Sequence, residues 1–155
     1  MSEGRELVQQ HTFLRGGNNM LEDSPFTIES FYKFLRERKL MAIKCCKCET
    51  LFLPPRPMCN KCLSTNFNWV KLEGRGELIS YTVIHFSSEQ FQSETPYTVG
   101  IVKLNEGLNL PGIIRDVNPK KIRVGMNLLV DFDTSIPLQW PQWSKYFFKL
   151  DELSP

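Results

Sequence analysis

The sequence lacks a long apolar run, has only two histidines and carries little excess charge of either sign. Among 155 residues, 19 Lys and Arg offset 17 Asp and Glu, for a formal net charge of +2. A transmembrane helix needs roughly 18–20 consecutive apolar residues, and the polar start MSEGRELVQQ has no apolar core of a signal peptide. Proteins that bind nucleic acid usually carry a larger or more clustered basic excess. We therefore expect a soluble, cytoplasmic protein without a membrane segment, for which nucleic acid is not the favoured partner.

Cysteine is absent outside the stretch KCCKCETLFLPPRPMCNKC, which holds all five cysteines of the chain. An odd number at metal-type spacing fits a reducing compartment better than a disulfide framework. A tetrahedral zinc site needs two pairs of thiolates, each pair on a tight turn with two intervening residues. Cys59 and Cys62 form one such pair, and Cys45 and Cys48 form the other, because Cys46 and Cys48 are separated by a single residue. The sequence therefore predicts one structural zinc site with four cysteine ligands and Cys46 left over; iron in a rubredoxin-like site is the alternative.

A closed four-thiolate site stabilises a fold but leaves no open coordination position for catalysis. Neither His11 nor His85 is arranged with a Ser, a Cys or a carboxylate in a pattern that predicts a catalytic triad. Cys46 lies beside lysines, which lower a thiol pKa, but we interpret it as an incidental residue outside the turn. The sequence therefore predicts a protein that is not an enzyme, and a zinc-dependent enzyme is the least favoured alternative.

Residues 23–39 are predicted to form an amphipathic helix. Ser24 and Pro25 are typical of a cap followed by a proline in the first turn, and apolar residues then recur at helical spacing. Its dense aromatic group has two interpretations, packing onto the protein's own core or docking into the groove of a partner. The side chains considered for partner docking are Phe26, Phe31, Tyr32, Phe34 and Leu35.

The rest of the chain divides into three further regions. Residues 1–22, with their Gly-Gly-Asn-Asn run, are predicted to form a flexible arm, and residues 40–73 a short rubredoxin-like zinc ribbon. In residues 74–155 the apolar period becomes two, which predicts five short strands of an OB-fold barrel. The expected strands begin at Arg75 and then cover 97–104, 110–117, 127–133 and 145–150. The predicted fold class is mainly β, with an N-terminal helix, a zinc ribbon and a five-stranded barrel.

The end of the chain is rich in aromatic residues. They either cover an open side of the barrel, which we favour, or present aromatic anchors to a partner. These residues are Trp140, Trp143, Tyr146, Phe147 and Phe148.

Several motifs, in this order, resemble one family. FYKFLRERKLMAIKCCKCETLFLPPRPMCNKC is similar to the helix-plus-ribbon opening of the zinc-ribbon/OB-fold acyl-CoA-associated proteins, a former domain of unknown function. WVKLEGRGELISYTVIH resembles the family's junction between ribbon and barrel, and PYTVGIVKLNEG and IRVGMNLLVDF resemble its second and fourth barrel strands. The resemblance covers about residues 24–135. Asn60 stands where the family usually has proline and Glu49 where glycine is common, and neither change removes a metal ligand.

The resemblance implies a non-catalytic partner of enzymes that handle acyl-CoA thioesters. Members of the family are found with condensing thiolases, and an archaeal member holds a thiolase and a hydroxymethylglutaryl-CoA synthase together and shapes a shared CoA site. We therefore expect an accessory or scaffold subunit that binds acyl-CoA, a thiolase-type enzyme, or both. The alternative is a nucleic-acid-binding module, but the strands YTVGIVKL and LPGIIRDV offer few of the aromatic side chains on which bases stack.

A surface that contacts CoA needs basic side chains for the phosphates beside an apolar channel for the pantetheine. Basic residues lie in the third expected strand of the barrel and in the turn after it, although a solvated basic turn is the alternative interpretation. Aromatic residues of the first two strands and their connection complete the candidate ligand site. Its members are Arg115, Lys120, Lys121, Arg123, Tyr81, Phe91 and Tyr97.

Overall fold

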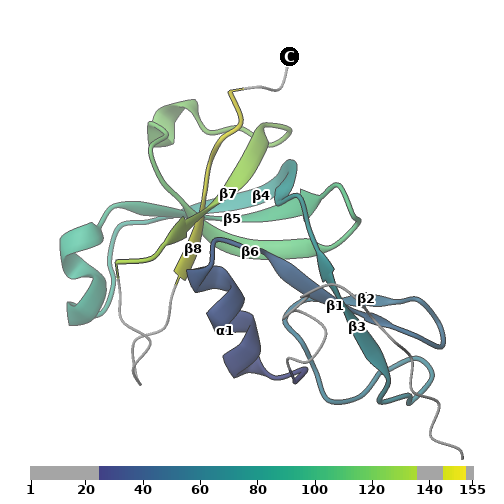
Figure 1. Ribbon diagram of the computed structural model, residues 1–155. Helices are drawn as coiled ribbons and strands as arrows, with labels where there is room; N and C mark the ends of the chain where they lie inside the picture. The colour runs from purple at the N-terminus through teal and green to yellow at the C-terminus, as the bar shows by residue number, and fades with distance from the viewer. Residues whose placement is uncertain (1–24, 136–144, 153–155) are drawn as a thin grey trace, which may run out of the picture.

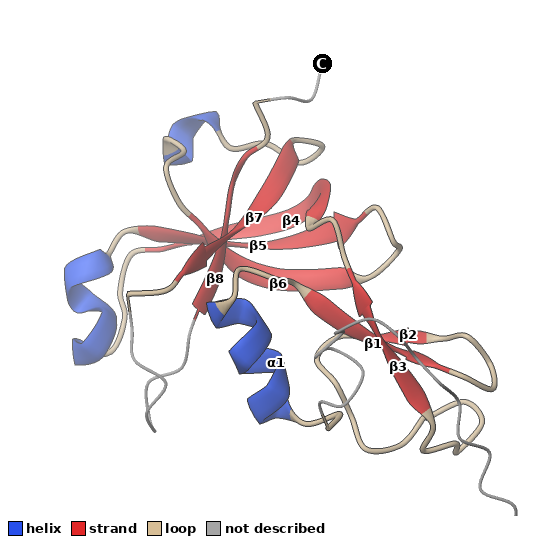
Figure 2. Ribbon diagram, in the orientation of Figure 1, coloured by secondary structure: helices blue, strands red, loops and turns tan. Residues whose placement is uncertain are grey.

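The computed structural model describes residues 25–135 and 145–152, apart from the side chains of Gln90 and Phe91. In this part of the chain, one α-helix lies against both a small three-stranded sheet and a five-stranded barrel (Figures 1 and 2). The arm predicted for residues 1–22, and Trp140 and Trp143 of the aromatic tail, fall outside the described residues. Within those residues, no helix combines the length and the apolar character needed to cross a membrane.

The helix α1 spans Ile28–Arg36 and begins later than the predicted start at Ser24–Pro25. Thr27 is the N-cap, and its Oγ1 accepts a hydrogen bond from the N–H of Ser30 at 3.3 Å. A threonine hydroxyl in this position satisfies one of the free N–H groups of the first turn, which is why the helix starts here. The helix ends in a Schellman motif, because the N–H of Lys39 donates to Phe34 O and that of Arg38 to Leu35 O.

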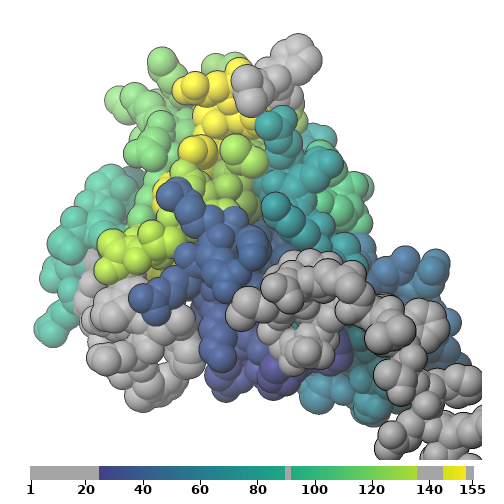
Figure 3. Space-filling view, viewed as in Figure 1, coloured from purple at the N-terminus to yellow at the C-terminus, as the bar shows by residue number. Residues whose placement is uncertain are grey.

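The aromatic face of α1 packs against the chain itself. Phe31 and Leu35 are buried in the core shared with the barrel. Phe34 meets the ring of Trp69 nearly edge-on, with centroids 4.9 Å apart, and Phe26 lies 5.6 Å from the same ring. In the space-filling view, the dark-blue side chains of α1 adjoin the yellow-green ones of the barrel (Figure 3). Burial of Phe31, Phe34 and Leu35 favours the core-packing interpretation over partner docking for these three residues.

The ribbon sheet has the order β2-β1-β3. Its strands are β1 (Met41–Cys45), β2 (Leu51–Phe52) and β3 (Phe67–Lys71), and both pairings are antiparallel. Side chains of a strand alternate between its two faces. Ile43 and Cys45 therefore face the small ribbon core, while Ala42, with Leu40 just before the strand, joins the barrel core.

The barrel closes in the order β4-β5-β6-β8-β7. Its strands are β4 (Arg75–Ile84), β5 (Tyr97–Leu104), β6 (Asn109–Ile114), β7 (Asn127–Asp133) and β8 (Lys145–Leu150). Short 3₁₀ helices, η1 (Glu89–Glu94) and η2 (Pro119–Lys121), lie in two of the connections. The single parallel pairing described, Ile114 with Phe148, joins β6 to β8 and closes the sheet. This architecture confirms the predicted fold class.

Strand β6 ends earlier than the predicted limit at Val117, because Asp116 adopts a left-handed φ of 60° that no strand can accommodate. At the other edge of the barrel, Phe148 of the aromatic tail is fully buried in the core. Tyr146 lies edge-on to it, with centroids 6.2 Å apart. Tyr146 and Phe148 thus belong to β8, a strand of the barrel itself, and the proposed covering role of the tail stays a prediction.

An ion-pair network ties the end of α1 to the barrel. Asp131 on β7 lies 2.7 Å from the ammonium of Lys149 on β8 and 3.0 Å from the guanidinium of Arg38. The hydrogen bond from Lys149, followed by those from the Phe132 N–H and Arg38, lowers the pKa of Asp131 to about 2. The end of α1 thus meets the consecutive strands β7 and β8 at one carboxylate.

Replacing Asp131 by Asn is expected to lower the free energy of unfolding at neutral pH by about 1 kcal/mol, since partly exposed pairs are screened by solvent. The carboxylate's folded pKa is depressed, so its contribution is complete above the unfolded pKa of about 3.9 and is lost as the pH falls towards 2. Urea titrations of the protein and Asp131→Asn at several pH values would show the difference shrink over that range. Glu77→Gln, at an exposed position on β4, is the control, and a difference that does not change with pH would contradict the network's role.

Candidate metal centre and apolar cavity

Each cysteine pair lies on the same kind of turn. The carbonyl of Cys45 accepts a hydrogen bond from the N–H of Glu49 at 2.9 Å, and that of Cys59 accepts one from Leu63 at 3.0 Å. Glu49 and Leu63 both adopt a left-handed backbone, with φ of 59° and 58°. Glycine adopts this conformation without strain, which explains why glycine suits the position that Glu49 occupies. The two knuckles are therefore backbone copies of one another.

The turns bring four sulfur atoms together. The Sγ atoms of Cys45, Cys48, Cys59 and Cys62 all lie within 4.8 Å of one another. Cys45 is 3.5 Å from Cys62, and Cys48 is 3.5 Å from Cys59. A tetrahedral zinc with 2.3 Å bonds to sulfur requires sulfur–sulfur distances of about 3.8 Å, so the four ligands fit one ion. Cys46 is exposed and lies outside the group, and the predicted four-cysteine metal site is confirmed in its composition.

The local electrostatics favour a bound cation. The hydroxyl of Thr50, 3.3 Å from Cys48 Sγ, and the N–H of Thr50 lower the pKa of Cys48 to about 6. The N–H of Ser64 favours the thiolate of Cys62, but burial and the neighbouring thiols prevail and raise its pKa to about 12. Four thiolates this close repel one another, and a divalent metal removes that repulsion when it binds. The donor set therefore suits zinc, which would hold the two knuckles in contact.

Substituting Cys48 by Ser is expected to abolish stoichiometric zinc binding, because it removes one of the four thiolates that a closed tetrahedral site requires. Cys46→Ser is the matched control and should retain one zinc per chain. Metal content by mass spectrometry, with near-ultraviolet circular dichroism of the ribbon aromatics, measures both effects. Loss of zinc from Cys46→Ser and retention in Cys48→Ser would overturn the ligand assignment.

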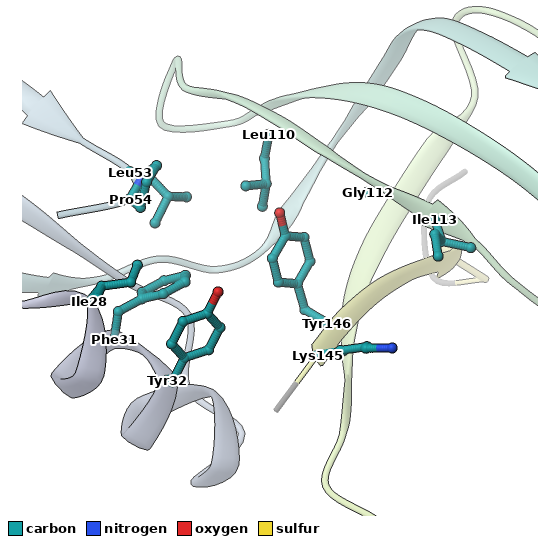
Figure 4. A pocket seen from close by; sticks show the side chains of 10 residues that line it. All are labelled: Ile28, Phe31, Tyr32, Leu53, Pro54, Leu110, Gly112, Ile113, Lys145 and Tyr146. Carbon is teal, nitrogen blue, oxygen red and sulfur yellow. The ribbon is translucent and has the colours of Figure 1, made fainter. Parts of the chain in front are cut away.

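An apolar cavity of about 440 Å³ lies where the helix, the ribbon and the barrel meet (Figure 4). Its walls come from α1, from the chain after β2, from β6 and from β8. The lining residues are Ile28, Phe31, Tyr32, Leu53, Pro54, Leu110, Gly112, Ile113, Lys145 and Tyr146. Lys145 is the one charged residue among them, and Figure 4 shows its Nζ turned away from the two tyrosines.

Two features of β6 and β8 shape the cavity. A Cβ added at Gly112 would lie 2.7 Å from the ring of Phe148, so the absence of a side chain lets that ring fill the core behind the cavity. The Tyr146 hydroxyl donates a hydrogen bond to the carbonyl of Pro111 at 2.6 Å. Burial raises the pKa of Tyr146 to about 12, so this hydroxyl stays protonated and engaged at neutral pH. The cavity is therefore largely apolar, and the hydroxyl of Tyr146 already has a hydrogen-bond partner.

The ligand residues predicted from the sequence are only partly brought together. Arg115 and Tyr97 line a separate cleft of about 480 Å³ between the start of β5 and the end of β6. The guanidinium of Arg115 lies 3.4 Å from Asp133 and 3.7 Å from Glu94, and it stands 4.9 Å above the ring of Phe147. The carboxylates of Asp133 and Glu94 thus already offset the positive charge of Arg115, which a CoA phosphate would need for binding.

The remaining predicted ligand residues do not line that cleft. Lys120 and Lys121 are exposed on η2, and Arg123 is exposed just after it, which agrees with a solvated basic turn. Tyr81 is 39% exposed on β4, and the side chain of Phe91 lies outside the described residues. The apolar cavity was not predicted from the sequence, because its walls come from four separate elements. The only sign of it in the sequence was the concentration of aromatic residues in α1 and β8.

A four-thiolate ribbon that shares its core with a closed five-stranded barrel defines a zinc-ribbon/OB-fold protein. The protein-family model of the ChsH2 rubredoxin-like zinc ribbon domain matches residues 33–68. The protein-family model of the ChsH2 C-terminal OB-fold domain matches residues 69–133. The chain belongs to the DUF35 family, which confirms the resemblance seen in the sequence. A DUF35 domain-containing scaffold protein of Methanocaldococcus jannaschii is 33% identical over 99 residues, 63% of this chain and 70% of that protein.

Two further similarities concern proteins named for acyl-CoA or aldolase chemistry. A probable enoyl-CoA hydratase alpha subunit of Thermomonospora curvata is 33% identical over 102 residues, which are 66% of this chain but only 32% of that protein. A chain in the solved structure of the Ltp2-ChsH2(DUF35) aldolase matches with a TM-score of 0.67 and 28% identity. That match covers 88% of this chain and 98% of the other.

Proposed function

We propose that this protein is a non-catalytic accessory subunit that binds an acyl-CoA enzyme of the thiolase, aldolase or hydratase type. The observation that carries the proposal is the match to the aldolase structure, which covers 98% of that chain and so includes helix, ribbon and barrel together. Relatives named as scaffold proteins and as a hydratase subunit support the same class of partner. The subunit would act by holding a catalytic protein or its thioester substrate in place.

The side chains of the metal site and of the cavity support a role in binding rather than in catalysis. The four thiolates are all committed to one metal site, so no ligand position is left for a substrate. The cavity lining holds neither a carboxylate nor a histidine, which are the usual groups for proton transfer. A wall of this kind excludes water and holds an apolar group, which is what an accessory subunit contributes to a shared site.

The finer proposal concerns the identity of the partner. We propose a thiolase-type condensing enzyme as the primary partner, with acyl-CoA contacted at the same interface. A hydroxymethylglutaryl-CoA synthase is the second enzyme that the subunit would bridge to the thiolase. The word scaffold in the names of the relatives supports the bridging role.

Purified protein is expected to co-elute in gel filtration with at least one thiolase-, aldolase- or hydratase-type enzyme encoded in the same genome. Light scattering of the peak would give the stoichiometry, and addition of the synthase would test the ternary complex. A labelled single-stranded oligonucleotide serves as the probe for the alternative function. Failure of every enzyme to co-elute, together with oligonucleotide binding that weakens steeply with salt, would replace the accessory role by nucleic-acid binding.

A further inference from the structure

The backbone likeness of the two cysteine knuckles extends beyond the ligands. The N–H of Cys45 donates a hydrogen bond to Thr50 O at 2.9 Å. The N–H of Cys59 likewise donates to Ser64 O at 2.9 Å. Thr50 and Ser64 therefore occupy the same place, two residues after the last cysteine of each knuckle. Any chemical difference between the two halves of the metal centre must then come from side chains and from the flanking chain.

The hydroxyls of these two residues have different partners. Thr50 Oγ1 lies 3.3 Å from Cys48 Sγ. A metal-bound thiolate has no proton to donate, so the hydroxyl is the donor in this contact once a metal is bound. Ser64 Oγ instead accepts a hydrogen bond from the N–H of Asn66 at 3.2 Å, and within the described part of the chain no hydrogen bond joins it to Cys62 Sγ. The Cys62 sulfur therefore has the N–H of Ser64 as a donor but lacks a hydroxyl.

The flanking chain also holds the first knuckle more firmly than the second. Strand β1 ends at Cys45 and β2 begins at Leu51, so two paired strands enter and leave the first knuckle. An ion pair of Lys44 with Glu49, at 3.3 Å, adds a weak further tie. The second knuckle lies in the long connection between β2 and β3, which Figure 2 shows as loop. Leu63, which takes the place of Glu49 there, is 67% exposed.

Solvent access separates the four sulfurs further. Cys45 and Cys59 are fully buried, whereas Cys48 and Cys62 are half-buried. All four are thiolates when a metal is bound, so an electrophile selects among them by access and by electron density at sulfur rather than by protonation. The Thr50 hydroxyl withdraws electron density from Cys48 and lowers its nucleophilicity. Cys62 is therefore the accessible ligand with the more nucleophilic sulfur.

We propose that Cys62 is a covalent modification site of the metal centre, at which a soft carbon electrophile attacks the metal-bound form. With an alkyl halide, a lone pair of the Cys62 sulfur forms a bond to carbon while the carbon–halogen bond breaks and the halide leaves. The product is a neutral thioether, so the ion loses one of its four thiolates and the centre opens at the second knuckle. This reaction needs no partner enzyme, so its outcome is independent of the proposed function.

The test is alkylation of the zinc-loaded protein at neutral pH with a substoichiometric amount of iodoacetamide. Cys46→Ser serves as the parent chain, because Cys46 is an exposed thiol outside the centre. Peptide mapping of the singly alkylated protein locates the adduct, and a chromogenic chelator follows the release of zinc. Cys62 is expected to carry at least about ten times more adduct than Cys48, the factor to which one hydrogen bond to a charged group corresponds. Labelling of any other ligand as strongly as Cys62, or zinc release that does not accompany the Cys62 adduct, would overturn the proposal.

Matched substitutions after the two knuckles test the role of the hydroxyl. Thr50→Val removes the donor with little change of shape, and the ratio of Cys62 adduct to Cys48 adduct should fall to about one tenth of its value in the parent chain. Ser64→Ala, at the equivalent position, should leave the ratio unchanged, and so should Thr50→Ser, which keeps a hydroxyl. Zinc content by mass spectrometry verifies that each variant retains its metal centre. An unchanged ratio in Thr50→Val, or an equal fall in Ser64→Ala, would contradict the protection of Cys48 by Thr50.

Discussion

The alternation of side chains along β1 is the constraint on which the rest of the structure depends. This strand is buried on both faces, with Ile43 and Cys45 directed to the ribbon core and Ala42 to the core of the barrel. A ribbon of this size buries too little apolar surface to be stable alone, and a metal usually makes up the difference. Here the ribbon gains a second source of stability, because the neighbouring residues Leu40 and Leu72 pack with the barrel. Ribbon, helix and barrel are consequently one structural unit.

This arrangement links the metal centre to the apolar cavity. Leu53 and Pro54, which form one wall of the cavity, belong to the segment between the two cysteine knuckles. Cys48 and Cys59 flank that segment, and a common metal ion would hold its two ends together. A separate contact joins α1 to the barrel, since Asp131 pairs with Arg38 at the end of α1 and with Lys149 of β8. The metal centre and the cavity are therefore connected through this one segment of chain.

Local patterns predicted most of the fold, and long-range contacts account for what they missed. The spacing of Cys45, Cys48, Cys59 and Cys62 was enough to identify the ligands, because a CxxC turn brings two thiolates together with little help from the remainder of the chain. Strands β5, β7 and β8 have the predicted limits, since polar or turn residues bound each alternating run. The cavity could not be foreseen, because Ile28 and Tyr146 meet only after the barrel has closed. The ion pairs of Arg115 with Glu94 and Asp133 also depend on contacts between separate elements. They engage a guanidinium that the sequence alone suggested for phosphate binding.

In both candidate sites, the metal centre and the cavity, the reactive side chains already interact with other groups of the protein. The thiolates are directed to a single closed site, and the phenol of Tyr146, with a pKa raised to about 12, is bound to the Pro111 carbonyl. Acid–base catalysis needs a group whose pKa lies near the working pH and whose proton is free to move. The residues that line the cavity include neither a carboxylate nor a histidine. In the described residues, the four cysteine thiols converge on one another and the Tyr146 hydroxyl donates to a backbone carbonyl, so both kinds of reactive group already have partners in the fold.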